Sequence, residues 1–183
     1  MTTLQPLDAM QTDRLSLERL RPQHRADLGR MHRDERVMAT LGGVRADAET
    51  ARVLAECDAH WVQHGFGLWA VRDRVTGAFA GRGGLKRTQV GGRDEVEVAY
   101  AFLPPYWGQG LATELAEVSV RVGFEVLSRP DLVCFTLTTN HASQRVMQKA
   151  GFRYERDMIH AGLPHVLYRL TASAWRAAAF VGG

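Results

Sequence analysis

Lysine is nearly absent from this sequence of 183 residues: Lys86 and Lys149 are the only two, so arginine supplies almost all of the 23 cationic side chains. The 20 acidic residues balance them to a net charge of +3. The arginines are scattered and do not form a basic arm. We therefore expect no nucleic-acid partner, although a mild preference for small anionic ligands is compatible with this charge.

Cysteine and long apolar runs are also scarce. Cys57 and Cys134 lie far apart and form neither a metal-ligand spacing nor a disulfide framework, so we expect a cytoplasmic protein without a metal site. Gln5, Asp8 and Asp13 interrupt the start of the chain where a signal peptide would be apolar, and no stretch is apolar enough to span a bilayer. We therefore expect neither secretion nor a membrane partner.

The remaining composition is that of one globular domain, with 45% hydrophobic and 23% charged residues. No internal repeat, low-complexity segment or Pro/Gly/Ser-rich linker divides the chain. We therefore expect a single domain over residues 1–183, with a core from about residue 12 to residue 170.

Hydrophobic periodicity predicts strands that alternate with helices. Strands are expected at 14–20, 66–73, 78–85, 95–103, 132–137, 152–160 and 166–170, and helices at 22–32, 47–64, 110–127, 140–150 and 172–180. Asp47 is expected to cap the second helix and Gly65 to end it. Because several consecutive strands precede the first strand-helix-strand crossover, the fold is expected to be α/β of the α+β type. Its sheet would be mixed and mostly antiparallel, with six to seven strands flanked by helices.

The most informative segment runs from Pro104 to Glu114. There a strand leads through a loop with Gly108 and Gly110 directly into the most regular helix of the chain. Backbone N–H groups that converge at a helix N-terminus bind anions, and glycine lets the backbone approach a phosphate closely. This segment predicts a pyrophosphate site.

Two common phosphate motifs do not fit this loop. A P-loop would need Lys followed by Ser or Thr after the second glycine, where Leu111 and Ala112 stand. A dinucleotide-binding motif would need Gly or Ala where Thr113 stands, and an acid that ends the next strand. A glycine-containing turn without a ligand stays open as the alternative.

Several ordered blocks of the sequence resemble the GNAT superfamily of acyl-CoA-dependent N-acetyltransferases. The blocks are Glu97–Phe102, Trp107–Glu114, Asn140–Ser143 and Ala150–Phe152. Two further blocks, Thr12–Leu15 and Gly65–Trp69, are similar to the RimJ/RimL branch, the ribosomal-protein N-terminal acetyltransferases. The resemblance extends from about Thr12 to Leu170. Trp107 departs from the Gln or Arg that begins the superfamily's glycine motif, but a Trp is familiar in this branch.

The resemblance implies that acetyl-CoA binds between strands 95–103 and 132–137, which would splay apart. The pantetheine arm would bond to main chain near Phe102 and Leu103, and the pyrophosphate would lie on the N–H groups of the glycine loop. The cofactor-binding residues implied in this way are Phe102, Leu103, Gln109, Gly110, Leu111, Ala112, Thr113, Asn140 and Ser143.

Glu97 is the best candidate for the general base, because acyl transfer needs a deprotonated amine and this carboxylate lies on the polar face of strand 95–103. It also matches an acid that recurs in this branch. The alternative is a solvated residue in a cross-strand ion pair. Glu95 on the same face is the reserve. His160 and His165 lie near the expected acceptor site, where solvated histidines are the simpler interpretation.

Asn140 and Ser143 form the second half of the expected site. Asn140 after a strand is by default a helix N-cap, and the resemblance adds a hydrogen bond to the pantetheine arm. Many superfamily members place a Tyr acid seven residues after this Asn, where the present chain has Met147. Ser143 is therefore the candidate general acid, with a capping role or a water molecule as alternatives.

These observations lead us to expect an enzyme that moves an acetyl group from acetyl-CoA to a primary amine by direct attack. Neither cysteine lies in a nucleophile motif, which favours direct transfer. The acceptor is expected to be a protein N-terminal amine, with a small-molecule amine such as an antibiotic or polyamine as the alternative. A non-catalytic acyl-CoA-binding module and a structural interaction domain also stay open. Homodimers are common in the family, but no sequence stripe identifies an interface.

Overall fold

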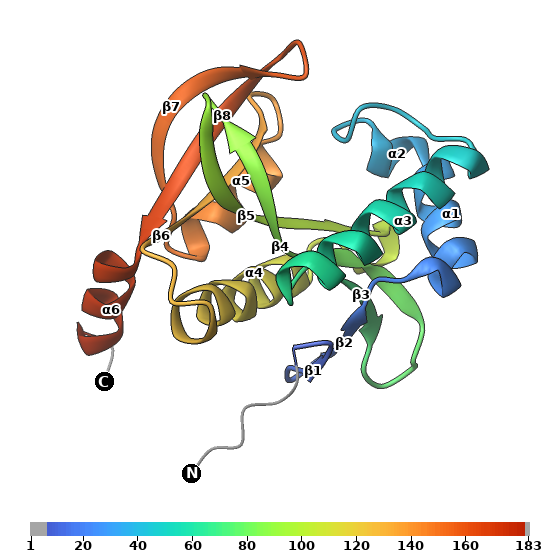
Figure 1. The fold of residues 1–183 in the computed structure, drawn as a ribbon, viewed down its shortest axis with the longest axis horizontal. Helices are drawn as coiled ribbons and strands as arrows, with labels where there is room; N and C mark the ends of the chain where they lie inside the picture. The colour runs from blue at the N-terminus through green and yellow to red at the C-terminus, as the bar shows by residue number, and fades with distance from the viewer. Residues whose placement is uncertain (1–6, 182–183) are drawn as a thin grey trace.

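The structure is a computed structural model that describes residues 7–181, and its centre is an eight-stranded sheet (Figure 1). The strands are β1 (Ala9–Gln11), β2 (Leu15–Arg19), β3 (Leu68–Asp73), β4 (Phe79–Val90), β5 (Arg93–Phe102), β6 (Asp131–Leu137), β7 (Arg153–His160) and β8 (Leu163–Thr171). Their order across the sheet is β1-β2-β3-β4-β5-β6-β8-β7.

Six α-helices accompany this sheet within residues 7–181: α1 (Arg25–Arg33), α2 (Glu35–Met38), α3 (Asp47–His64), α4 (Leu111–Arg121), α5 (His141–Lys149) and α6 (Ala172–Val181). Short 3-10 turns occupy Pro22–His24 and Pro104–Tyr106, and α4 continues into a π-helical turn at Val122–Val126. None of the helices in the described part of the chain is both long and apolar enough to cross a membrane.

Most expected elements are confirmed, and the differences have local causes. The sheet has eight strands instead of six to seven, because β1 is a three-residue edge strand without an alternating pattern. Asp47 is not the N-cap of α3: Ala46 holds that position, and Glu49 accepts a hydrogen bond from the Ala46 N–H. Gly65 ends α3 as expected, with a left-handed φ of 73°.

The central sheet is mixed and mostly antiparallel, as the sequence predicts. Only β5 and β6 run parallel, and they pair at a single position, Glu97 with Val133. By contrast, β4 and β5 pair along ten positions from Gly81–Phe102 to Val90–Arg93. Beyond Glu97 the strands β5 and β6 therefore separate, which is the splay that the resemblance implies.

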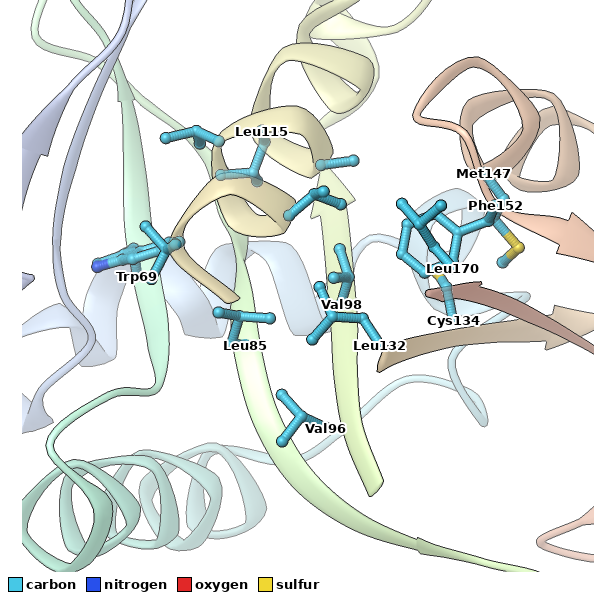
Figure 2. Packing of buried hydrophobic residues seen from close by; sticks show 14 of the residues in the cluster. Trp69, Leu85, Val96, Val98, Leu115, Leu132, Cys134, Met147, Phe152 and Leu170 are labelled. Carbon is cyan, nitrogen blue, oxygen red and sulfur yellow. The ribbon is translucent and has the colours of Figure 1, made fainter. Parts of the chain in front are cut away.

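The largest apolar cluster lies on the face of the sheet that α4 and α5 cover. Figure 2 shows Leu115 of α4 facing Leu85 and Val98 of the sheet, while Cys134 of β6 lies near Phe152 in another part of the cluster. All of these side chains are buried. This packing anchors α4, so the start of α4 is held at the end of the splay.

The opposite face carries two smaller clusters. One packs α1, α2 and α3 against β3, β4 and the alanines of β5. The other joins Val90, Val133 and Leu167 with Phe135 and Met158 near the β7–β8 hairpin. In Figure 1 the β7–β8 hairpin and the α1–α3 helices stand on opposite sides of β4 and β5. Polar side chains of β4 and β5 lie between the two clusters.

One buried histidine of α1 ties the stability of the fold to pH. His32 is 1% exposed, and its Nδ1 lies 2.9 Å from the Thr50 hydroxyl. Burial, together with the positive charges of Arg45 and Arg82, lowers the pKa of His32 to about 4. The folded state therefore resists protonation of His32 over a range in which the unfolded chain accepts a proton.

We predict that acidification from pH 6.5 to pH 4 destabilises the protein partly through His32, because the unfolded state binds the extra proton there. His32→Asn, which keeps a polar atom for Thr50, should flatten this dependence. Melting temperatures of both proteins across this range provide the test. Identical slopes for both would contradict the assignment.

Candidate functional site

The loop before α4 has the geometry of an anion site. Gly108 and Gly110 have φ values of 72° and 77°, and Gly110 forms the N-cap of α4. The first bonded amide of the helix is that of Glu114, which donates to the Gly110 carbonyl at 3.1 Å. Within residues 7–181, the N–H groups of residues 109–113 find no backbone or side-chain acceptor. Five successive donors without protein acceptors are suited to a phosphate.

Glu114 fixes this loop to the start of the chain. Its Oε1 accepts hydrogen bonds from the Thr12 hydroxyl and from the Arg14 N–H, and its Oε2 pairs with Arg14 Nε at 2.7 Å. The Arg14 Nη1 also donates to the Gln109 carbonyl at 2.7 Å. The Thr12–Leu15 block and the glycine loop, about one hundred residues apart, therefore form one unit.

A shallow hollow of about 370 Å³ lies beside this unit. Its lining residues are Asp13, Arg14, Gly110, Thr113, Glu114, Glu117 and Lys149. Arg14 is already paired with Glu114, whereas Lys149 forms no ion pair with the described part of the chain. Lys149 is thus the cation of this hollow that a phosphate could engage.

At the end of β5, only some of the main-chain hydrogen-bonding groups are free for a ligand. Leu103 donates its N–H to Ala80 at 2.8 Å, so this amide is not free for a pantetheine arm. The Phe102 carbonyl accepts a hydrogen bond from the Trp107 indole at 2.7 Å. Trp107 therefore anchors the glycine loop to β5, although its side chain is half exposed. The Phe102 and Leu103 carbonyl oxygens are therefore the main-chain groups here that could still accept a hydrogen bond from a ligand.

Across the splay, Tyr100 joins β5 to the start of α5. Its hydroxyl lies 3.0 Å from Ser143 Oγ and donates to the Ser143 carbonyl at 3.1 Å. Burial raises the pKa of Tyr100 well above its usual range, with further contributions from Cys134 and Glu97 that outweigh the Ser143 hydrogen bond. The phenol therefore keeps its proton, and Ser143 contacts it directly.

Asn140 is the N-cap of α5, as the sequence predicts. Its Oδ1 accepts from the Ser143 N–H at 3.2 Å, and its Nδ2 donates to the Thr136 hydroxyl at 3.0 Å. Met147 is 1% exposed and packs in the core, so no side chain at that position can serve as an acid. Of the residues expected on this helix, only Ser143 keeps a hydroxyl near the splay.

Glu97 lies where β5 and β6 begin to separate, since its pairing with Val133 is the only one between these strands. It is 6% exposed, and Lys86 Nζ on the opposite position of β4 lies 3.2 Å from its Oε2. This approach is not directed as a hydrogen bond, so Oε2 has no hydrogen-bond donor within residues 7–181. The expected cross-strand ion pair is present, with its carboxylate buried and the Lys86 side chain 41% exposed.

Glu95 has a structural role and is not a second base. Arg169 binds both of its oxygens, with Nη2 at 2.9 Å from Oε1 and Nη1 at 3.1 Å from Oε2. The same guanidinium also pairs with Asp131 and Glu155. Hydrogen bonding to Glu95 raises the pKa of Arg169. This network holds β5, β6 and the β7–β8 hairpin together.

Two histidines of the hairpin flank this face. His165 is buried and its Nδ1 lies 2.9 Å from the Leu163 carbonyl, while His160 packs against Phe135 with ring centroids 4.7 Å apart. Burial lowers the pKa of His160, and the charges of Glu97 and Lys86 also act on it. The described residues hold no group of three or more His, Cys, Asp or Glu placed to bind a metal ion.

Lys86 and Tyr100 belong to this site but were not among the residues expected from the sequence. Lys86 could have been found from the β4–β5 hairpin register, which sets it opposite Glu97. Tyr100 was expected only as an apolar strand residue, because its partner on α5 lies 43 residues away. No local signal in the sequence marks such a contact.

Comparison with known proteins agrees with this arrangement. A family model described as "Acetyltransferase (GNAT) domain" matches residues 14–153. The uncharacterized protein YkkB of Bacillus subtilis is 27% identical over 158 residues, 86% of this chain and 92% of that protein. The FsC-acetyl coenzyme A-N(2)-transacetylase of Aspergillus fumigatus is 27% identical over 83% of this chain and 68% of that protein.

The fold is likewise similar to a solved structure. A putative GnaT-family acetyltransferase from Bordetella pertussis superimposes with a TM-score of 0.78. The two chains are 23% identical, and the match covers 88% of this chain and 98% of that one. The eight-stranded, splayed sheet described above is therefore the fold of an acetyltransferase.

Glu114→Ala should weaken both stability and coenzyme A binding, because it removes the acceptor for three donors from Thr12 and Arg14. We expect a loss of about 1–3 kcal/mol in the free energy of unfolding. Denaturant titration and calorimetry with coenzyme A measure the two effects. Glu125→Ala, an exposed carboxylate in the turn after α4, is the matched control.

The Glu114 effect should also depend on pH. Partial burial alone would raise the pKa of Glu114, but hydrogen bonds from Thr12 and Arg14 outweigh it and lower the pKa below the ordinary 4.5. The stabilisation is therefore complete above pH 4.5 and declines as the pH falls further. A stability difference between wild type and variant that stays constant down to pH 3 would contradict this role.

Proposed function

Because this chain belongs to the GNAT acetyltransferase family, whose members use acetyl-CoA, we propose that it acetylates a primary amine by direct attack on the thioester. One observation carries this proposal. The buried Glu97 lies at the point where β5 and β6 separate, and the free N–H groups of residues 109–113 lie at the other end of that separation. A base and a phosphate site thus flank one opening of the sheet.

The residues present fit the coenzyme. The N–H groups of residues 109–113 would bind its pyrophosphate, and Lys149 offers a cation in the adjoining hollow. The Phe102 and Leu103 carbonyls and Asn140 would bind the pantetheine arm. When bound, acetyl-CoA supplies the activated acetyl group. The pyrophosphate site consists of backbone donors, so it requires no excess of basic side chains.

Glu97 would act as the general base. Its carboxylate is buried, its Oε2 lacks a hydrogen-bond donor, and Lys86 holds it in place from the neighbouring strand. Such a carboxylate can accept a proton from the ammonium group of an acceptor, directly or through one water molecule. The acceptor would enter on the face of the sheet that carries Glu97, between the α1–α3 cluster and the β7–β8 hairpin. Glu95 cannot share this role, because Arg169 occupies both of its oxygens.

Ser143, positioned by Tyr100, would stabilise the leaving thiolate. Ser143 Oγ is within hydrogen-bond distance of the Tyr100 hydroxyl, which is buried and protonated. Ser143 would thus donate its hydroxyl hydrogen bond to the leaving sulfur, and Tyr100, which keeps its own proton, positions Ser143. This pair takes the place of the tyrosine that α5 lacks at Met147.

For the acceptor we propose a protein N-terminal amine, which the RimJ/RimL-like blocks of the sequence support. A second candidate is a small-molecule amine, favoured by the similarity to the Aspergillus FsC-acetyl coenzyme A-N(2)-transacetylase. Transfer to peptides of varied first residue, compared with a panel of small amines, distinguishes the two. Release of the coenzyme thiol reports each reaction.

We predict that Glu97→Gln lowers kcat by about 10²- to 10⁴-fold, because the amine loses its proton acceptor. Coenzyme A affinity should not change, since Glu97 lies away from the phosphate site. Steady-state kinetics and calorimetry measure the two quantities. Asp94→Asn, an exposed carboxylate on the same strand, is the matched control. Full activity of Glu97→Gln with intact coenzyme binding would favour a non-catalytic binding module or another base.

We also predict that Ser143→Ala and Tyr100→Phe each reduce kcat, and that the double variant is no worse than Ser143→Ala alone. This non-additivity follows if Tyr100 acts through Ser143. A structural role for Tyr100 would instead give additive losses and a lower melting temperature. Single-turnover rates and melting curves of the three proteins distinguish these outcomes.

A further inference from the structure

A cation without a partner lies on the acceptor side of the sheet. Arg82 of β4 is opposite Ala101, and in the same register Lys86 is opposite Glu97. Positions 82 and 86 therefore point to the same face as Glu97, the face that α1, α2 and α3 cover. Within residues 7–181, Arg82 forms no side-chain hydrogen bond or ion pair, and its Nε is buried without a partner.

The surroundings of Arg82 are also cationic. Burial, reinforced by the positive charge of Arg45, lowers the pKa of Arg82, and the partial compensation comes from Cys57 and Glu97. Glu97 is the only carboxylate in this set, and it is already paired with Lys86. An arginine remains charged in proteins, so this site holds a positive charge that the described residues do not neutralise.

Unsatisfied polar atoms are concentrated on this face. Five buried side-chain nitrogen or oxygen atoms of the described residues have no hydrogen-bond partner. Three of them are Arg82 Nε, His32 Nε2 and Glu97 Oε2. The charge of Arg82 contributes to the low pKa of His32, and that of Glu97 acts on Arg82. Glu97 has Lys86 beside it, so Arg82 is the charged group of the three that has no partner among the described residues, and buried polar groups ordinarily have one.

Resting on the function proposed above, we propose that the amine acceptor carries an anionic group, a carboxylate, which binds Arg82 while the amine lies at Glu97. Four residues along a strand span about 13 Å between backbone positions, and both side chains are long. The carboxylate and the amine are thus separated by several bonds, as in a short peptide or an amino acid with a distal amine, so this inference favours the small-molecule candidate over the N-terminus of a long protein. Arg82 and Lys86 would repel a polyamine.

The test compares acceptors that differ only in this charge. Di- and tripeptides are assayed as free acids and as C-terminal amides, with a phosphate-bearing amine as a further arm. We expect wild type to prefer the free acids by about tenfold to a hundredfold in kcat/KM, the usual effect of a charge-assisted hydrogen bond. A larger preference for the phosphate-bearing amine would overturn the assignment to a carboxylate.

Variants locate the preference in one side chain. Arg82→Gln should abolish the preference for the free acids while leaving kcat/KM for the amides near its wild-type value, and Arg82→Lys should retain part of it. Arg87→Gln, an exposed arginine on the other face of β4, is the matched control and should behave as wild type. A preference that survives in Arg82→Gln would overturn the proposal.

A second measurement does not depend on turnover. If Arg82 is present for a ligand, Arg82→Met keeps the apolar stem, removes an unpaired buried charge and should leave the melting temperature unchanged or raise it by about 2–5 °C. A lower melting temperature would show that Arg82 is structural, which contradicts the proposal.

The two proposals fail in different ways. Equal wild-type rates with free acids and amides refute the anion site and leave the acetyltransferase function intact. Loss of transfer to every amine, with coenzyme A still bound, would instead refute the proposed function and the inference that rests on it.

Discussion

A single backbone pairing, Glu97 with Val133, determines where this protein can bind and react. Had β5 and β6 continued to pair, their main-chain groups would be satisfied within the sheet and no ligand could enter. Because they separate, the groups beyond this point need other partners. Tyr100 contacts Ser143 across the separation, and Trp107 bonds to Phe102 at its far end. The proposed base Glu97, the Tyr100–Ser143 contact and the loop before α4 thus all take their positions from one pairing.

The phosphate loop is stable because distant segments support it. Five N–H groups without acceptors are unfavourable in an empty helix start, and left-handed φ values restrict Gly108 and Gly110. Glu114 counters this by binding Thr12 and Arg14 at the beginning of the chain, while Leu115, one residue later, is fully buried. Helix α4 therefore presents its polar start to solvent and its apolar face to the sheet. The glycine loop before it is held in place by these contacts, so its free N–H groups stay exposed.

Patterns within a few neighbouring residues predicted most of the elements and the glycine loop. The features that the sequence did not predict depend on contacts between elements far apart in the chain. Alternation identified β5 with Glu97 on it, and the glycines identified the loop at 108–110, because each pattern is complete within a few residues. The three-residue β1 has no such pattern, and the N-cap of α3 was misplaced by one position since both Asp47 and Ala46 can begin a helix. The contacts of Tyr100 depend on how β5 and α5 are brought together, which periodicity does not encode.

The two ends of the site follow the same rule, because each holds donors that lack an acceptor in the described part of the chain. At α4, unsatisfied donors need an anion that the chain does not provide, and the coenzyme's pyrophosphate has that chemistry. On the opposite face, Arg82 is likewise a donor without an acceptor, in a setting where Lys86 and Arg45 add further positive charge. Buried polar groups ordinarily have partners, so an unpaired one calls for an explanation. An acceptor that brought only an amine would leave Arg82 Nε without a partner, whereas one that also brings a carboxylate would supply it.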